Sequence, residues 1–192
     1  MTTGTDRPRL ALHVCCGPCA TSVVERLWEE VHVEAVWYNP NIQPTDEYER
    51  RLEAMRYLAQ AVDLPLTVLD YDVERWEAAC AGLMAEPEGG ARCPVCFAMR
   101  MRKVAQFAAQ RGIEYFTTTL TVSPHKPATI INDLGLQIAR ECGIAFVERD
   151  FKKADGFKRS VQLSRELGLY RQRYCGCLPS LRDAREHLEK GK

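Results

Sequence analysis

The sequence predicts an α/β fold in which five short parallel strands form one sheet and helices cover both of its faces. Runs rich in apolar and β-branched residues alternate along the chain with segments whose apolar residues recur at helical spacing. Strands that alternate with helices in this way are joined by right-handed crossovers, so all five run in parallel. We expect these strands at residues 9–14, 33–38, 66–71, 113–120 and 144–148.

The segments between the strands carry the signals that begin and end helices. Pro18 suits the first turn of a helix that continues to Glu30, because that position needs no N–H. Thr45 or Asp46 can cap the next helix, and Gly112 stops another before the fourth strand. Helices are therefore expected over residues 20–30, 45–62, 73–84, 94–111 and 128–142 and at the C-terminus.

The ligand crevice of an open parallel sheet lies beyond the carboxyl ends of its strands. Four segments directly follow predicted strands, and we expect them to meet in that crevice. They are residues 15–19, 39–44, 123–127 and 150–152.

The length of 192 residues is enough for one domain with a full core, spanning residues 1–192. The α/β core is expected over about 9–150. The remainder, about 151–192, is rich in lysine and arginine and contains two cysteines. We expect it to form a helical extension that packs on the active-site face.

The charges balance, with 26 basic and 26 acidic residues, so the molecule as a whole is no polycation. Any contact with a nucleic acid must then come from a local patch. The sequence shows neither a stretch apolar enough to cross a bilayer nor the apolar core of a signal peptide. These features favour a soluble, cytoplasmic protein without a membrane partner.

Nine cysteines in a cytoplasmic protein indicate metal or redox chemistry rather than a disulfide framework. Cys80 and Cys142 stand alone among apolar neighbours and are interpreted as small buried hydrophobes. The other seven fall in three clusters: Cys15, Cys16 and Cys19; Cys93 and Cys96; Cys175 and Cys177. Three clusters far apart in sequence, one of them in a ligand-binding turn, favour a shared centre.

Residues 13–19 form the first cluster, at the turn from the first strand into the first helix. Helix N-terminal N–H groups favour the thiolate, which is the form that binds metals and reacts. A structural zinc ion takes four ligands, and so does a [4Fe–4S] cluster. Seven thiols exceed either set and leave three, with His13, for a second metal or a dithiol. This surplus favours electron transfer over a purely structural role.

Gly176 separates the two cysteines of the last cluster. A glycine there lets the backbone fold tightly enough for Cys175 and Cys177 to chelate a metal or to close a small, strained disulfide. Strained disulfides are the labile, catalytic ones.

Five motifs together resemble the QueH family of epoxyqueuosine reductases, over residues 10–180. They are His-x-Cys-Cys-x-Pro-Cys at 13–19, Tyr-Asn-Pro-Asn-Ile-x-Pro at 38–44 with Glu47-Tyr48, Cys-x-x-Cys at 93–96, Thr-Leu-x-x-Ser-Pro-x-Lys at 119–126, and Tyr-Arg-Gln-x-Tyr-Cys-Gly-Cys at 170–177.

The resemblance implies an adenine-nucleotide-hydrolase-like Rossmann fold and the last step of queuosine biosynthesis. In that step the epoxide oxygen of epoxyqueuosine, at the wobble position of tRNA, leaves as water after the addition of two electrons and two protons. Related tRNA-modifying enzymes carry a phosphate loop after their first strand. Residues 15–19 take its place here, so a metal centre is expected instead of ATP-dependent chemistry.

The resemblance also implies roles for individual residues. Cys15, Cys16, Cys93 and Cys96 correspond to [4Fe–4S] ligands, and Cys175 with Cys177 to a redox-active pair. Neighbouring side chains such as those of Cys15 and Cys16 tend to point apart. A second allocation therefore gives one of them, with Cys19 and the C-terminal pair, to a second iron or zinc ion.

A proton donor is needed for the departing oxygen, and the candidates are Tyr38, Asp150 and His13, with His125 behind them. Each has a plainer alternative. His13 is equally consistent with a hydrogen bond that holds the cysteine turn, Asp150 with pairing to a nearby lysine, and Tyr38 with core packing.

Basic residues near the last cysteine cluster are candidates for holding phosphates of the tRNA anticodon loop, whose unstacked bases can be drawn into a pocket. The plainer alternative is a solvated helix face. The electron donor cannot be identified from the sequence. The candidate residues are Lys126, Arg149, Lys152, Lys153, Lys158, Arg159, Arg171 and Arg173.

Two other functions are compatible with the cysteines. One is a zinc-stabilised RNA-binding module without catalysis, and the other is a thiol–disulfide oxidoreductase that needs no iron. Both leave the loops at 39–41 and 123–126 unexplained.

Overall fold

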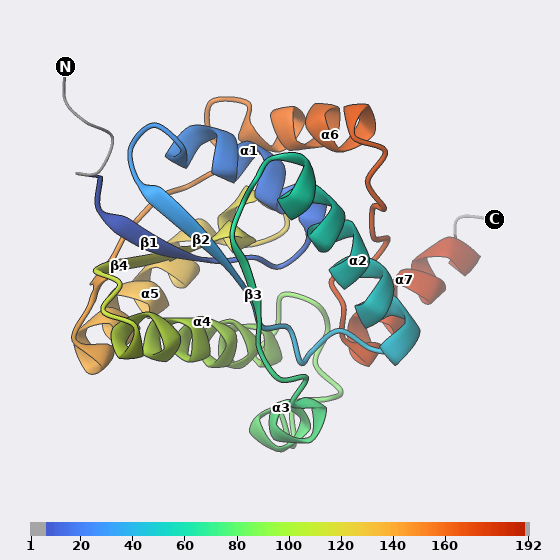
Figure 1. The fold of residues 1–192 in the computed structure, drawn as a ribbon. Coiled ribbons are helices and arrows are strands. Elements are labelled where there is room, and N and C mark those ends of the chain that lie inside the picture. Colours follow the sequence, from blue (N-terminus) through green and yellow to red (C-terminus); the bar gives the residue numbers. More distant parts are fainter. Residues whose placement is uncertain (1–6, 191–192) are drawn as a thin grey trace.

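The computed structural model describes residues 7–190, which form one five-stranded parallel sheet with helices on both faces (Figure 1). The order across the sheet is β3-β2-β1-β4-β5, so β1 lies at the centre. The predicted α/β fold is therefore confirmed. The strands are β1 (Arg9–His13), β2 (His32–Trp37), β3 (Leu66–Val68), β4 (Tyr115–Thr118) and β5 (Ala145–Phe146).

Helices α1, α2 and α6 cover one face of the sheet, and α4 and α5 cover the other (Figure 1). The short α3 lies beyond the β3 edge, and α7 stands near the beginning of α2. The helices are α1 (Gly17–Leu27), α2 (Thr45–Ala61), α3 (Val73–Ala79), α4 (Arg92–Gln110), α5 (Ala128–Cys142), α6 (Gly156–Glu166) and α7 (Leu178–Lys190), with a 3₁₀ helix η1 (Thr119–Val122).

The central strand β1 has both of its faces buried, and its side chains alternate between two apolar cores. Leu10 and Leu12 belong to the core beneath α1 and α2, whereas Ala11 belongs to the core beneath α4 and α5. The alternation follows from the two-residue period of a strand. Burial on both faces explains why the strand is almost wholly apolar.

Four elements end earlier than the sequence predicts. Strand β4 stops at Thr118, whose hydroxyl accepts a hydrogen bond from the backbone N–H of Leu120 at 3.2 Å and starts η1. Helix α3 stops at Ala79, and Gly82 follows with a φ of +78°, which a continuing helix does not allow. At the opposite edges of the sheet, β3 and β5 are shorter than expected.

The register of the sheet brings the functional loops together. His13 at the end of β1 pairs with Val36 of β2 on one side and with Thr118 of β4 on the other. The turn after β1 therefore emerges between the loops that follow β2 and β4, as the crevice rule predicts.

Among the described residues, no helix combines the length and the apolar character that a membrane span requires.

Candidate metal centre

The turn between β1 and α1 is held by both neighbouring loops. The side-chain amide of Asn39 donates to the carbonyl of Val14 at 2.9 Å. The backbone N–H of Cys15 donates to the hydroxyl of Thr119 at 3.0 Å, and this hydroxyl in turn donates to the Cys15 sulfur at 3.2 Å. These contacts fix the first cysteine cluster at the carboxyl edge of the sheet.

The three sulfur atoms of Cys15, Cys16 and Cys19 all lie within 4.8 Å of one another. We call these residues the turn thiols. Tetrahedral ligands about 2.3 Å from one metal are separated by about 3.8 Å, so the turn thiols fit a shared metal centre with little movement. Cys16 also caps α1, where its sulfur accepts from the backbone N–H of Cys19 at 3.4 Å.

The turn thiols differ in their affinity for protons. Hydrogen bonds from the thiols of Cys16 and Cys19 hold the pKa of Cys15 well below its ordinary value, and the positive charges of Arg100 and Lys126 act in the same direction. The hydrogen bond that Cys16 gives to Cys15 raises its own pKa to about 12, and the same interaction raises the pKa of Cys19. The turn thiols thus combine one thiol that ionises readily with two that hold their protons more tightly, and a metal that bound all three would have to displace those protons.

A second thiol group lies in apolar surroundings. Cys80, Cys96 and Cys177 pack together with Trp76, and all four side chains are buried. We call the three cysteines the apolar thiols. Burial raises the pKa of Cys80 to about 12. The prediction that Cys80 is a small buried hydrophobe agrees with this position, but its place beside two predicted ligands was not expected. Cys142 is only partly buried.

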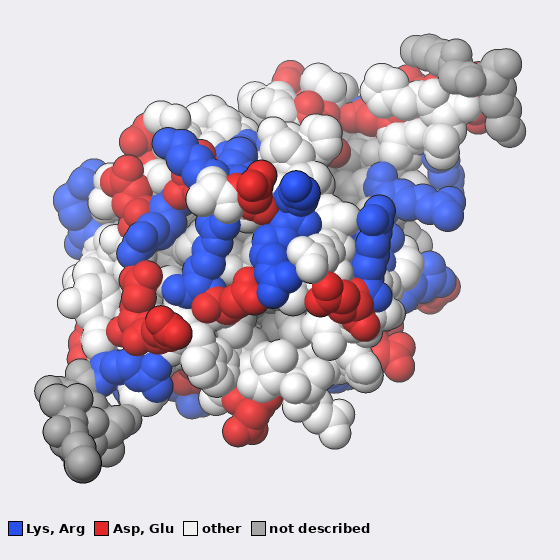
Figure 2. Space-filling view, turned by 90° about the horizontal axis from the view of Figure 1, so that it is seen from above, with Lys and Arg blue, Asp and Glu red and all other residues white. Residues whose placement is uncertain are grey.

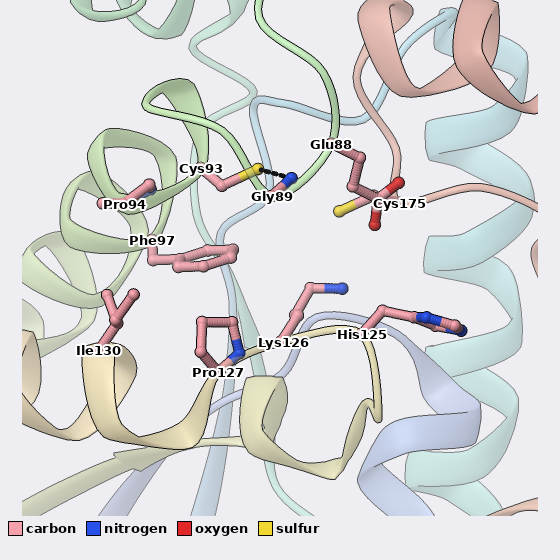
Figure 3. Close-up of a pocket in the computed structure, with 10 residues that line it drawn as sticks. All are labelled: Glu88, Gly89, Cys93, Pro94, Phe97, His125, Lys126, Pro127, Ile130 and Cys175. Atoms are coloured by element: carbon pink, nitrogen blue, oxygen red, sulfur yellow. Dashed lines mark hydrogen bonds between the residues drawn. The ribbon is translucent and has the colours of Figure 1, made fainter.

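Cys93 and Cys175 flank a small pocket that also contains Lys126 (Figure 3). The backbone N–H of Gly89 donates to the Cys93 sulfur at 3.2 Å. In the close-up, the Lys126 ammonium points toward the Cys175 side of the pocket. Burial raises the pKa of Cys175 to about 11, with Lys126 opposing this effect. All nine cysteines are free thiols, including the 175–177 pair.

A groove of about 1240 Å³ joins these groups. Cys15, Cys19 and Cys175 line it together with Arg100 and Lys126. The first and last cysteine clusters, 156 residues apart from Cys19 to Cys175, therefore open to the same space. Its volume exceeds the range of about 300–1,000 Å³ typical of small-molecule sites, which leaves room for a metal centre and part of a macromolecular substrate.

Arg51 of α2 holds the loop that carries the last cysteine pair. Its guanidinium donates to the carbonyls of Cys175 at 2.9 Å and Tyr174 at 3.2 Å. It also pairs with Glu47 at 2.7 Å, and the Tyr170 hydroxyl donates to the same carboxylate at 2.8 Å. Both charged side chains are buried. The loop is thus positioned by a buried ion pair with its hydrogen bonds satisfied.

Gly176 has a φ of +144°, in a region that L side chains rarely adopt. A Cβ there would lie 2.9 Å from the amide nitrogen of Asn41 and 3.3 Å from a guanidinium nitrogen of Arg51. The expected tight backbone at this glycine is confirmed. The backbone at Gly176 is constrained both by its φ value and by the close approach of the 39–42 loop.

Arg100 lies at the floor of the groove, one turn beyond Cys96 on α4. It is 2% exposed and donates to the Cys96 sulfur at 3.7 Å. Its Nε and Nη2 atoms are buried without a hydrogen-bond partner among the described residues. The positive charge also contributes, after burial, to lowering the pKa of His13 to about 3.

Three of the candidate proton donors are not among the residues that line the groove. His13 is fully buried, with its Nδ1 atom 2.8 Å from the Thr118 hydroxyl. Tyr38 donates to Asp72 at 3.0 Å, and burial with this bond raises its pKa to about 12. Asp150 pairs with Lys152 at 2.9 Å. Their plainer structural interpretations therefore describe what the structure shows.

His125 is exposed and lines both the groove and the small pocket (Figure 3). Of the four candidate proton donors, it is the one among the groove-lining residues. The assignment of a donor stays a prediction.

The candidate RNA-binding residues divide into three groups. Lys126, Arg171 and Arg173 line the groove. Three others pair with acidic residues: Arg149 with Glu30, Lys152 with Asp150 and Arg159 with Glu25. The last two, Lys153 and Lys158, are exposed and do not line the groove. Figure 2 shows lysine and arginine interspersed with acidic side chains on the face that carries α6. The groove-lining group is therefore the better candidate for phosphate contacts.

Sequence reasoning missed Arg100, Arg51 and the position of Cys80. The first two carry a signal in hindsight: Arg100 interrupts an apolar stripe of α4 between Phe97 and Met101, and Arg51 precedes Leu52 on the buried side of α2. A charged residue on an apolar stripe is buried with a partner. The packing of Cys80 depends on tertiary contacts that have no sequence signal.

Comparison with known proteins agrees with this arrangement. Residues 10–183 match the family model described as epoxyqueuosine reductase QueH. The chain belongs to this family. It is 38% identical over 182 residues to the epoxyqueuosine reductase QueH of Thermotoga maritima, with 93% of each chain covered. It is also 38% identical to the protein of that name in Streptococcus pyogenes serotype M1, over 90% of this chain and 70% of that protein.

The fold is also that of a solved tRNA-modifying enzyme. The U34-tRNA thiolase NcsA from Methanococcus maripaludis, solved with its [4Fe-4S] cluster, has a TM-score of 0.58 to this chain. Coverage is 97% of this chain and 68% of NcsA, at 11% sequence identity. This likeness shows the fold alone, an α/β fold like the one that the sequence predicts.

Proposed function

We propose that this protein is an epoxyqueuosine reductase that acts on the wobble nucleoside of tRNA. Both C–O bonds of the epoxide break, a carbon–carbon double bond forms, and the oxygen leaves as water after two electrons and two protons are added. The electrons come from an external one-electron donor. Family membership and the names of the relatives support this activity, and the thiol-lined groove supplies a place for it.

The observation that carries the proposal is the groove at the carboxyl edge of the sheet. It contains thiols from the turn and from the C-terminal loop, together with four cationic side chains, Arg100, Lys126, Arg171 and Arg173. Seven clustered cysteines exceed the four that one structural zinc ion takes. A site that only stabilised the fold would need neither the surplus thiols nor an opening to solvent.

The cysteines are proposed to hold the metal. In one allocation Cys15, Cys16, Cys93 and Cys96 bind a [4Fe–4S] cluster, which would supply electrons one at a time. In the other, the close spacing of the turn thiols serves a single iron or zinc ion, a second metal that would act as a Lewis acid. Cys175 and Cys177 either complete these sets or act as a redox-active pair.

The chain's own groups then determine where the substrate lies. Lys126, Arg171 and Arg173 are proposed to bind phosphates of the anticodon loop at the groove mouth. The extruded nucleoside enters toward Cys15 and Cys175. His125 on the groove wall is proposed to deliver a proton to the departing oxygen, because its side chain reaches this space.

The cellular setting is part of the proposal. Free thiols and a tRNA substrate are typical of the reducing cytoplasm. The C-terminal residues, whose loop at 174–176 contacts α2, are proposed to fold with the core as one domain.

The test is a turnover assay under anaerobic conditions. The purified protein is reduced with dithionite and incubated with epoxyqueuosine-containing tRNA, and the nucleosides are then measured by mass spectrometry. Loss of one oxygen atom from the nucleoside is the expected result. Intact epoxyqueuosine with an iron-loaded, reduced enzyme would refute the proposal. Turnover that persists in iron-free protein would favour a thiol–disulfide mechanism instead.

A further inference from the structure

Arg100 is a buried cation for which the protein provides no carboxylate. It is 2% exposed, and no ion pair within residues 7–190 includes it. A guanidinium is always charged, and a buried charge without an anionic partner is strongly destabilising. The anion that compensates Arg100 must therefore come from its surroundings.

The hydrogen-bond partner that the structure gives Arg100 is a sulfur atom. Its Nη1 donates to Cys96 at 3.7 Å, while Nε and Nη2 have no partner among the described residues. Arg100 also lines the groove together with Cys15 and Cys175. The guanidinium thus contacts a cysteine of one sequence cluster and shares the groove with cysteines of the other two.

A phosphate of the tRNA does not fit as the partner. Arg100 is at the floor of the groove, and its unpartnered nitrogen atoms are shielded from solvent. A phosphate attached to a polynucleotide backbone would need an exposed donor, such as Arg173 at the mouth. Cysteines that are predicted metal ligands already lie near Arg100, with Cys96 in hydrogen-bond contact and Cys15 and Cys175 lining the same groove.

We propose that Arg100 is the counter-charge of the thiolate-ligated centre and raises its reduction potential. The inference rests on the proposed iron–sulfur function and adds a positioning and tuning residue to it. Net charge and hydrogen bonds to sulfur are main determinants of cluster potentials. Each added electron makes the centre more negative, so a fixed positive charge stabilises the reduced form more than the oxidised form. The effect is strong in a site screened from water.

The test is a redox titration of the anaerobically reconstituted cluster, monitored by electron paramagnetic resonance and without tRNA. Arg100→Met keeps an unbranched, flexible side chain, shorter than that of arginine, and removes its charge, whereas Arg100→Lys keeps the charge. Arg102→Gln is the matched control, because Arg102 is on the same helix but 39% exposed and paired with Glu141.

We expect Arg100→Met to lower the equilibrium constant for reduction at least tenfold, which is about 59 mV for a one-electron couple. Arg100→Lys should change it less than threefold, and Arg102→Gln should leave it unchanged. If the Met and wild-type clusters have equal potentials, or if the Lys variant shifts as far as the Met variant, the inference is wrong.

The unfolding temperature of the metal-free protein provides a second test. Without the centre, the Arg100 charge is undercompensated, so Arg100→Met should unfold at the same temperature as the wild type or higher. A clear loss of stability would instead assign Arg100 a structural role.

If Arg100→Met takes up no iron while Arg100→Lys does, the need for a charge is upheld. Failure of both variants to take up iron would overturn it.

These outcomes are separate from those of the proposed function. Turnover by the wild type with equal potentials in all variants would leave the function standing and reject the inference. If Arg100→Met has a lower reduction potential than the wild type, but the wild type cannot reduce epoxyqueuosine, the inference stands and the proposed function is rejected.

Discussion

The turn thiols and the apolar thiols are brought together by the fold in two different ways. The turn thiols come from five consecutive residues, and polar groups such as the Thr119 hydroxyl and the Gln172 amide donate to them. The apolar thiols come from three separate segments and pack against Trp76. Hydrogen bonds from neighbouring thiols lower the pKa of Cys15 at the turn, whereas burial raises the pKa of Cys80.

The two groups of thiols therefore depend on different parts of the fold. The turn thiols are fixed by strand register alone, since the loops after β2 and β4 hold them. The position of Cys177 depends on Arg51, Glu47 and the backbone at Gly176. Substitutions should therefore affect the two groups of thiols differently. The predictions below are ordered from the largest expected effect to the smallest.

The largest effect is expected from removing a turn thiol. Cys15→Ala should abolish uptake of iron and sulfide, because it removes the thiolate of the group and a predicted cluster ligand. Cys80→Ala should retain both and lose only about 1 kcal/mol of stability, since it deletes a small buried group. Iron analysis and urea unfolding measure these outcomes. Loss of iron from Cys80→Ala would show that Cys80 is a ligand and would contradict the distinction between the turn thiols and the apolar thiols.

Next is the support of the C-terminal loop. Arg51→Met should cost roughly 3–5 kcal/mol of unfolding free energy, because it leaves the Glu47 carboxylate buried without its cation. Arg50→Met is the control, since Arg50 lies 3.8 Å from the same carboxylate but is 57% exposed, and its loss should be much smaller. Chemical denaturation of the metal-free proteins compares them. Equal losses would show that the buried pair does not hold the loop.

A smaller effect is expected at the glycine between the last two cysteines. Gly176→Ala should cost roughly 1–3 kcal/mol through backbone strain, with an added contact against Asn41. Gly82→Ala also has a positive φ but meets nothing within 4 Å, so it measures the backbone contribution alone. Thermal unfolding compares the variants. If both lose the same stability, the close approach of the 39–42 loop contributes nothing.

The smallest effect concerns the mouth of the groove. Arg173→Gln should weaken tRNA binding several-fold and reduce the slope of log affinity against log salt by about 0.7–0.9, the value for one phosphate contact. Arg140→Gln removes an exposed charge on α5 outside the groove and should change neither. Binding is measured by fluorescence anisotropy over a salt series. An unchanged slope for Arg173→Gln would remove this residue from the RNA interface.

The same salt series tests charge reversal at Lys152 and Lys153, two of the candidate RNA-binding residues. Lys152 is paired with Asp150, whereas Lys153 is exposed. Reversal at Lys153 should therefore have the larger effect on salt dependence if this segment contacts tRNA.

Much of the fold follows from the sequence, because periodicity and helix signals report local structure. The parallel direction of the strands and the convergence of the loops at 13–19 and 39–41 followed from the alternation of strands and helices, whereas the order of the strands was not predicted. The roles of Tyr38 and Asp150 did not, because their partners Asp72 and Lys152 are set by side-chain packing. Arg100 was missed for the same reason, since its surroundings come from three distant segments.

The most direct test of the account is the amount of iron, zinc and acid-labile sulfide in anaerobically purified protein. The account predicts about four iron and four sulfide per chain, the content of one [4Fe–4S] cluster, with one further iron or zinc ion if the second site is filled. A colourless protein that contains zinc and neither iron nor sulfide would contradict it and would favour a zinc-stabilised RNA-binding module.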